Sequence, residues 1–193
     1  MKLKNIILSG LFVSVLISCE GVTDISPKDS LTDASYWSKV EDLKLYANNL
    51  YTNLSAPGID KDNVSDNCIT TNYSSYLFNE TTIPSTASEA GWTWGNIRNC
   101  NFFLTRYQKV QAAPSEVNPY VAEVRFFRAL DYFGKIKQFG DVPWYDKDLQ
   151  TADTDELYKP RDTRDFVLGK IIEDLEFAIQ WLPDADKAEK GRL

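Results

Sequence analysis

The chain has 193 residues, a formal net charge of −7 and no histidine. The acidic charge argues against nucleic acid or an anionic membrane surface as a partner. Without histidine the chain has no Ser-His-Asp or Cys-His nucleophile system, no histidine-ligated zinc and no imidazole acid–base catalysis, so an enzyme of this sequence would rely mainly on carboxylates.

The N-terminus has the pattern of an export signal. Two lysines precede an apolar run over residues 6–17, which is too short to cross a bilayer, because a helix needs about 20 apolar residues to do so. The sequence Leu16-Ile17-Ser18-Cys19 follows and matches a lipobox, in which signal peptidase cuts before a lipidated cysteine. We therefore predict a lipoprotein signal peptide at residues 1–18 and lipidation of Cys19. An ordinary secretory peptide with an incidental cysteine is the alternative.

The next segment predicts a tether and then a helix. Residues 19–30 are polar and turn-rich, as expected between a lipid anchor and a folded domain. Ser38 and Glu41 have the spacing of a capping box, and apolar residues recur behind them at helical spacing. We expect the first helix at residues 39–54, before a turn at residues 55–58.

A long irregular loop is expected between the first two helices. Residues 57–90 are rich in Gly, Pro, Asn, Ser and Thr and show no sustained period, apart from weak strand propensity near residues 69–78. The second helix is predicted at residues 91–108. Cys68 and Cys100 could pair in an oxidising compartment, but two buried free thiols are slightly favoured.

Two further helices are predicted in the second half of the chain. The third spans residues 119–139, with Asn118 as its N-cap and Pro119 at its first position, and the fourth spans residues 163–182. Their expected apolar faces comprise Val121, Val124, Phe127, Ala129, Leu130 and Phe133 in the third, and Phe166, Val167, Ile171, Ile172, Leu175, Ala178, Ile179 and Leu182 in the fourth. Four helices without a convincing strand predict an all-α fold.

The segment from Glu123 to Pro143, EVRFFRALDYFGKIKQFGDVP, resembles the signature segment of the SusD/RagB family. Further features fall in the family's order: the lipobox cysteine, Ser30-Leu31-Thr32 before Tyr36-Trp37, Asn48 to Tyr51, Ile97 to Leu104 with Asn101, Arg161 to Thr163, Leu182-Pro183 and Gly191-Arg192. The resemblance covers essentially the whole chain. It implies tetratricopeptide-like helical hairpins, with residues 31–193 forming an N-terminal domain that is incomplete at its C-terminus.

The resemblance also implies a function. Members of this family are lipid-anchored proteins of the outer membrane and cell surface that bind nutrient oligosaccharides without catalysis or a cofactor. They pass the ligand to a TonB-dependent, SusC-like transporter, and some relatives serve peptide uptake instead. The open alternatives are a peptide-binding uptake lipoprotein, a protein-interaction module of the same fold and, less favoured, a lipid-anchored glycoside hydrolase.

Candidate ligand contacts come from the segment between the first helix and the start of the second, where some family members carry part of their ligand platform. Aromatic faces suit the apolar sides of sugar rings, and planar amides suit paired hydroxyl groups. The candidates are Asn72, Tyr73, Tyr76 and Trp92. For each aromatic residue, packing of the loop onto the helices is the competing interpretation. Trp94, Trp144 and Trp181 lie on or next to apolar helical faces, so we expect them to be buried.

The charged residues of the last two helices carry no clear catalytic pattern. Among Glu123, Arg125, Arg128 and Asp131 of the third helix, only Arg128 and Asp131 have the spacing of an ion pair. Bracing of neighbouring helices or simple solvation is the favoured role of these residues. Glu173, Asp174 and Glu176 fall among the polar positions of the fourth helix, which predicts a solvated face. Neither group has the opposed carboxylates that a glycosidase needs.

Overall fold

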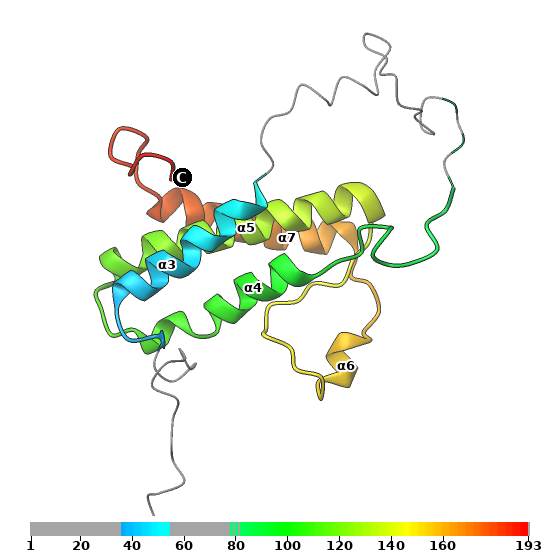
Figure 1. The fold of residues 1–193 in the computed structure, drawn as a ribbon, viewed down its shortest axis with the longest axis horizontal. Helices are drawn as coiled ribbons and strands as arrows, with labels where there is room; N and C mark the ends of the chain where they lie inside the picture. The colour runs from blue at the N-terminus through cyan, green and yellow to red at the C-terminus, as the bar shows by residue number, and fades with distance from the viewer. Residues whose placement is uncertain (1–35, 55–77, 79, 81, 193) are drawn as a thin grey trace, which may run out of the picture. The chain divides into compact units, whose positions relative to one another are not determined.

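The computed structural model describes residues 36–54, 78, 80 and 82–192, and the regular secondary structure of these residues is helical (Figure 1). The chain divides into two units, Met1–Tyr36 and Trp37–Leu193. The second contains α3 (Val40–Leu50), α4 (Gly95–Leu104), α5 (Pro114–Phe139), α6 (Thr154–Leu157) and α7 (Arg164–Trp181), with 3-10 turns at Tyr51–Asn53 and Tyr107–Lys109. The described residues form no strand, only an isolated bridge between Val142 and Asp162. The predicted all-α fold is confirmed.

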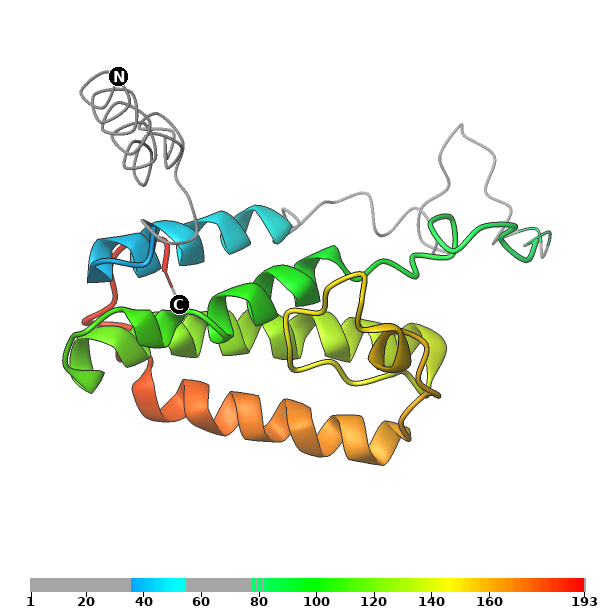
Figure 2. The same cartoon turned by 90° about the horizontal axis from the view of Figure 1, so that it is seen from below.

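Helix α5 is the centre of the helical unit. It packs against α7 on one side and against α3 and α4 on the other (Figures 1 and 2). The fully buried side chains between these helices include Leu43 and Leu50 of α3, Ile97 and Phe103 of α4, Val121, Val124 and Tyr132 of α5, and Val167 of α7. Buried residues recur every three or four positions, as Leu43, Ala47 and Leu50 do in α3 and Val117, Val121 and Val124 do in α5, which is the helical period of the apolar pattern.

The first helix begins one residue later than predicted, and a different carboxylate caps it. Asp42, not Glu41, accepts hydrogen bonds from the backbone N–H groups of Ser38 and Lys39, at 3.1 and 3.0 Å. The Ser38 hydroxyl donates to the same oxygen at 3.0 Å. The predicted capping box is therefore wrong by one residue, because the chain enters the helix one residue later, with Lys39 at the N-cap position.

The third helix begins five residues earlier than predicted. Pro114 occupies its first turn, and the Glu116 carboxylate accepts the Ala113 N–H at 3.2 Å, so the helix start is already satisfied there. Pro119 lies inside the helix and not at its first position. It is tolerated near the N-terminus, although it removes one hydrogen bond to the preceding turn.

The second helix is shorter than predicted, because residues 91–94 are not helical. Gly91 has φ of +73°, a left-handed conformation that favours glycine, and α4 begins only at Gly95. The Gln138 side chain of α5 donates to the Ala90 carbonyl at 2.6 Å and holds this turn. Trp92 and Trp94 therefore lie on the extended approach to α4.

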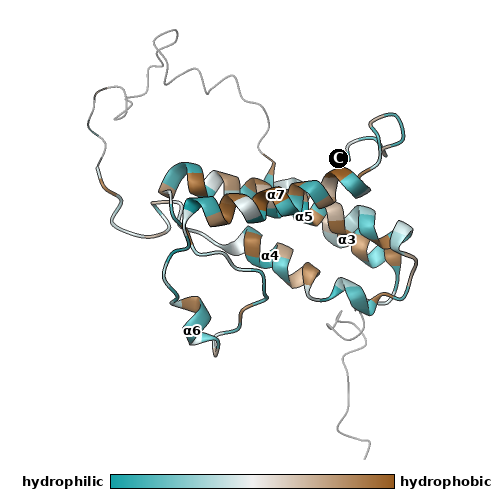
Figure 3. Cartoon of the chain, turned by 180° about the vertical axis from the view of Figure 1, so that it is seen from behind, coloured by the Kyte–Doolittle hydropathy of each residue, from teal (hydrophilic) through white to brown (hydrophobic). Residues whose placement is uncertain are grey.

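Several residues expected on apolar core faces are exposed. The buried stripe of α7 consists of Val167, Ile171, Asp174 and Ala178. Ile172 and Ile179 follow members of this stripe by one position, about 100° around the helix, and are 53% and 82% exposed. Phe166, Leu130 and Phe133 are exposed as well, and hydrophobic segments recur along α5 and α7 in Figure 3.

A buried ion pair joins α5 to α7. Arg128 donates from Nε and Nη2 to the two oxygens of Asp174, at 2.7 Å each. The prediction of a solvated Asp174 is wrong, and Arg128 pairs across helices instead of with Asp131. Sequence spacing misses this partner because it lies 46 positions away along the chain. The expected bracing of neighbouring helices is confirmed for this residue.

A second clamp joins the turn after α7 to α5 and α3. Arg192 donates to both oxygens of Glu123 in α5, at 2.9 and 2.6 Å, and also contacts the Asn48 side chain of α3. Glu123 is only 3% exposed, and burial raises the pKa of its carboxyl against the opposing effect of Arg192. The Gly191-Arg192 pair thus fastens the end of the chain onto the helices.

The other predictions of burial are met in part. Trp144 is buried, whereas Trp94 and Trp181 are half-buried. Cys100 is a buried free thiol, and Cys68 lies outside the described residues. In the described part of the chain, every helix is too short or too polar to span a membrane.

Candidate ligand-binding site

A closed loop over residues 141–162 forms one wall of the candidate site. It leaves the end of α5, carries α6 and returns to the start of α7 (Figure 1). Its neck is fastened by the Val142–Asp162 bridge and by the Trp144 N–H, which donates to the Asp162 carboxylate at 2.8 Å. The Lys159 ammonium donates to the Trp144 carbonyl at 2.6 Å. These short contacts hold the loop against the helices.

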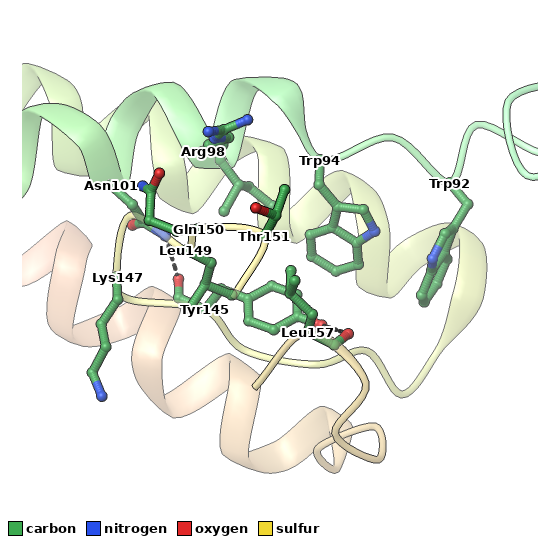
Figure 4. A pocket seen from close by; sticks show the side chains of 11 residues that line it. Trp92, Trp94, Arg98, Asn101, Tyr145, Lys147, Leu149, Gln150, Thr151 and Leu157 are labelled. Atoms are coloured by element: carbon green, nitrogen blue, oxygen red, sulfur yellow. Dashed lines mark hydrogen bonds between the residues drawn. The ribbon is translucent and has the colours of Figure 1, made fainter. Parts of the chain in front are cut away.

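A cavity of about 340 Å³ lies between this loop and α4 with its approach (Figure 4). It is lined by Trp92, Trp94, Ile97, Arg98, Asn101, Tyr145, Lys147, Leu149, Gln150, Thr151 and Leu157. Trp92 and Trp94 lie at one end in Figure 4, and Asn101 and Lys147 lie at the other. The cavity is therefore aromatic at one end and polar at the other.

The aromatic end is built from rings that meet edge to face. The Trp94 ring centroid lies 5.2 Å from that of Trp92 and 5.2 Å from that of Tyr145, with interplanar angles of 82° and 79°. Phe139 packs against Trp92 at 4.8 Å, and the Arg161 guanidinium lies 4.8 Å from the same ring. Such contacts fix the ring orientations, and they leave Trp94 and Tyr145 as central walls of the cavity.

The main chain of Tyr145 is held by Tyr132, which lies deep in α5. The Tyr132 hydroxyl accepts the Tyr145 N–H at 2.6 Å and donates to the Tyr145 carbonyl at 3.2 Å. The Tyr145 hydroxyl in turn donates to the Leu157 carbonyl at 3.2 Å. Burial raises the pKa of Tyr132 far above its ordinary value, so this hydroxyl stays protonated and keeps its donor.

Asn101 connects the cavity to the buried ion pair. Its Oδ1 accepts from Nη1 of Arg128 at 2.9 Å, and its Nδ2 donates to the Tyr145 carbonyl at 2.8 Å. Because Arg128 has only donors, the oxygen of this amide must face the guanidinium. The Arg128–Asp174 pair therefore fixes the orientation of Asn101, which in turn holds the loop residue Tyr145 against α4.

Asp148 ties the polar end of the loop to α4. Its side chain is 6% exposed and lies between two arginines, 2.8 Å from Nη2 of Arg106 and 3.7 Å from Nε of Arg98. The neighbouring residues Lys147 and Leu149 line the cavity. This contact positions the segment that closes the polar end.

The candidates drawn from the sequence fall in different places. Trp92 lines the cavity. Asn72, Tyr73, Tyr76 and the lipidation candidate Cys19 lie outside the described residues.

Sequence reasoning missed Trp94, Tyr145 and Asn101 as cavity residues. The pair Trp92-Thr93-Trp94 directly before a helix was a usable signal for Trp94. For Tyr145 there was none, because its loop reaches α4 only in the folded structure. In the part of the chain described, acidic residues and cysteines nowhere gather in a group of three or more able to hold a metal ion.

A family model described as "Starch-binding associating with outer membrane" matches residues 23–191 of the chain. The chain belongs to the SusD-like family. The resemblance predicted from the Glu123 to Pro143 segment is confirmed, and the family's description associates SusD-like proteins with starch binding and the outer membrane.

Two SusD-like proteins of Formosa agariphila, P38 and P25, are 27% and 25% identical to the chain over 190 and 201 residues. Each alignment covers 92% of this chain but only 37% or 38% of the relative. The chain thus spans little more than a third of the length of these relatives.

Two solved structures from Bacteroides fragilis have the same fold. A SusD-like protein superposes with a TM-score of 0.71 at 29% identity, over 86% of this chain and 34% of its own. A SusD-like carbohydrate-binding protein superposes with a TM-score of 0.64 at 19% identity, over 81% and 34%. At this lower identity the second structure supports the fold alone.

Proposed function

We propose that this SusD-like chain binds an oligosaccharide, without cleaving it, in the cavity between α4 and the 141–162 loop. The observation that carries the proposal is the aromatic end of the cavity, where Trp94 and Tyr145 meet at 5.2 Å beside Trp92. A sugar ring has an apolar face that packs on such rings, and its hydroxyl groups seek planar amides and other polar groups. Gln150 and Thr151 of the 141–162 loop supply these groups, whereas the Asn101 amide is already bonded to Arg128 and to the Tyr145 carbonyl.

The size and rigidity of the cavity suit a short stretch of glycan. About 340 Å³ is near the lower end of the range for small-molecule sites, roughly 300 to 1,000 Å³. Tyr145 and Asn101 are held by hydrogen bonds before any ligand arrives. Binding to groups already in place costs less conformational entropy than ordering a loose loop.

The same proposal includes the location and the partner. We infer that residues 1–18 are removed, that Cys19 carries the lipid and that residues 19–30 tether the helical domain to the outer membrane at the cell surface. The oligosaccharide would then be delivered to a TonB-dependent, SusC-like transporter. The lipobox and the family's association with the outer membrane support these steps.

A second candidate is protein or peptide binding through the helices, favoured by the exposed apolar residues of α5 and α7. Phe133, Ile172 and Ile179 are 47%, 53% and 82% exposed. Side chains of this kind often mark contact surfaces when they gather in a patch. This candidate predicts capture of a protein or peptide by these helices and no affinity for saccharides.

Calorimetric titration of the full chain with oligosaccharides and peptides tests the proposal. We expect saturable saccharide binding without release of reducing sugar, and a loss of about tenfold, or about 1.4 kcal/mol, for Trp94→Ala. Tyr158→Ala is the control, since Tyr158 is an aromatic residue of the 141–162 loop that is 86% exposed and outside the cavity lining. Its affinity should equal that of the unsubstituted chain.

Further variants define the extent of the site. Trp92→Ala tests the far end of the aromatic wall, and Tyr73→Ala and Tyr76→Ala test whether the long loop contributes. Helical circular dichroism of each variant confirms that its fold survives. Saccharide binding that Trp94→Ala leaves unchanged would place the site elsewhere, and release of reducing sugar would favour a glycoside hydrolase.

A further inference from the structure

The charged side chains that line the cavity all carry the same sign. Arg98 and Lys147 are cations, and the cavity lining that the structure describes includes no aspartate or glutamate. The chain as a whole has a formal net charge of −7. The cavity is therefore a cationic site on an acidic protein. This local positive charge attracts anions and repels cations.

Both cations have donors to spare. The Arg98 side chain is 64% exposed, and its contact with Asp148, at 3.7 Å, is too long for a hydrogen bond. Asp148 is instead bonded closely to Arg106, at 2.8 Å. Lys147 is exposed. The planar guanidinium of Arg98 therefore keeps several N–H groups that a ligand can use.

Three acidic residues of the 141–162 loop have bonding partners within the protein. Asp153 accepts the backbone N–H of Gln150 at 2.7 Å, and Glu156 lies 3.6 Å from the Lys159 ammonium. Asp148 is shared between Arg106 and Arg98, as described above. None of these three carboxylates lines the cavity, whereas Arg98 and Lys147 do.

We propose, resting on the proposed saccharide binding, that the cavity selects an oligosaccharide with an anionic substituent. A sugar ring packs against Trp94 and Tyr145, while its charged group bonds to Arg98 of α4 or to Lys147 of the loop, which line the cavity from different sides (Figure 4). A uronic acid carboxylate and a sulfate ester share this chemistry. Both offer several oxygens to a guanidinium, which binds such groups with two parallel hydrogen bonds.

Three oligosaccharides of equal length test the selection by calorimetry with the full chain: one neutral, one with uronic acid and one with sulfate esters. We expect at least one charged ligand to bind about ten times more tightly than the neutral one at low salt, which is the lower end of what one charge-assisted hydrogen bond provides. The advantage should shrink as ionic strength rises, because both cations are open to solvent.

Substitutions assign the effect to these residues. Arg98→Gln and Lys147→Gln should each weaken binding of the charged ligand about fivefold more than binding of the neutral one, and Lys147→Glu should weaken it further. Lys190→Gln removes an exposed lysine outside the cavity and controls for net charge. Lys147 is exposed in a loop, so its variants should keep the fold even where Arg98→Gln does not.

The possible outcomes distinguish failure of the charge selection from failure of the proposed saccharide binding. Equal affinity for the charged and neutral ligands, or a charge preference that Lys147→Gln and Lys147→Glu leave intact, overturns the selection while saccharide binding stands. Binding of an acidic peptide but of no acidic saccharide overturns it as well. Absence of binding to every saccharide overturns the proposed function and this inference together.

Discussion

Replacing Asp174 with alanine should destabilise the protein strongly, although the sequence places this residue on a polar helix face. The substitution removes two hydrogen bonds of 2.7 Å from Arg128, whose side chain is 8% exposed. Each charge-assisted bond contributes about 1.5 to 3 kcal/mol, and breaking a buried ion pair on one side costs about 3 to 5 kcal/mol in all. We expect a loss of about 4 kcal/mol in the free energy of unfolding.

Urea denaturation followed by circular dichroism measures this loss, with Glu173→Ala as the matched control. Glu173 is the neighbouring carboxylate, its side chain is 60% exposed and it pairs with Lys170 at 2.8 Å. An exposed pair of this kind contributes at most about 0.5 kcal/mol. Asp174→Asn, which keeps the volume but removes the charge, should fall between the two. An equal, small effect of Asp174→Ala and Glu173→Ala would refute the assignment of a buried, bracing ion pair.

The start of the first helix and the buried thiol give two more predictions. Asp42→Ala should lower the free energy of unfolding by about 1 kcal/mol, and Glu41→Ala by much less. Hydrogen bonds to the Asp42 carboxylate outweigh its burial and lower its pKa below 3.8, so the stabilisation is present above that pH. The urea midpoints of Asp42→Ala and of the unsubstituted chain should therefore converge as the pH falls through the lowered pKa. A gap that persists in strong acid would contradict this. Burial raises the pKa of Cys100 to about 12, so in a chain with Cys19→Ser and Cys68→Ser the remaining thiol should resist iodoacetamide at pH 8 until urea is added. Rapid alkylation of the folded protein would show that Cys100 is accessible.

The sequence predicts helices well where apolar residues recur at helical spacing. It predicts poorly which helices and side chains contact one another. The fourth helix begins at Thr163 as expected, because the Thr163 side chain accepts the Phe166 N–H. The third begins early, since Pro114 and Glu116 form a helix start that the later Asn118-Pro119 pair obscured. Both pairs are valid local signals, and in the structure the earlier one begins the helix.

The candidate site could be predicted only in part for a related reason. Trp92 stands next to a helix start and is an aromatic residue in a loop, which is a local property. The role of Tyr145 depends on a hydrogen bond to Asn101, 44 positions away. Likewise, Ile172 and Ile179 satisfy the helical apolar pattern but lie one position beyond the stripe that faces α5. Periodicity locates the hydrophobic face of a helix to within about one residue. A shift of one residue is enough to turn a buried side chain into an exposed one.

A crystal structure of the full chain with a bound oligosaccharide tests the central claim most directly. The account predicts a sugar ring in van der Waals contact, at about 4 Å, with Trp94 or Tyr145 in the cavity between α4 and the 141–162 loop. Its hydroxyl or charged groups should lie within hydrogen-bonding distance of Gln150, Arg98 or Lys147. A saccharide bound at another surface, with this cavity filled only by solvent, would contradict the account.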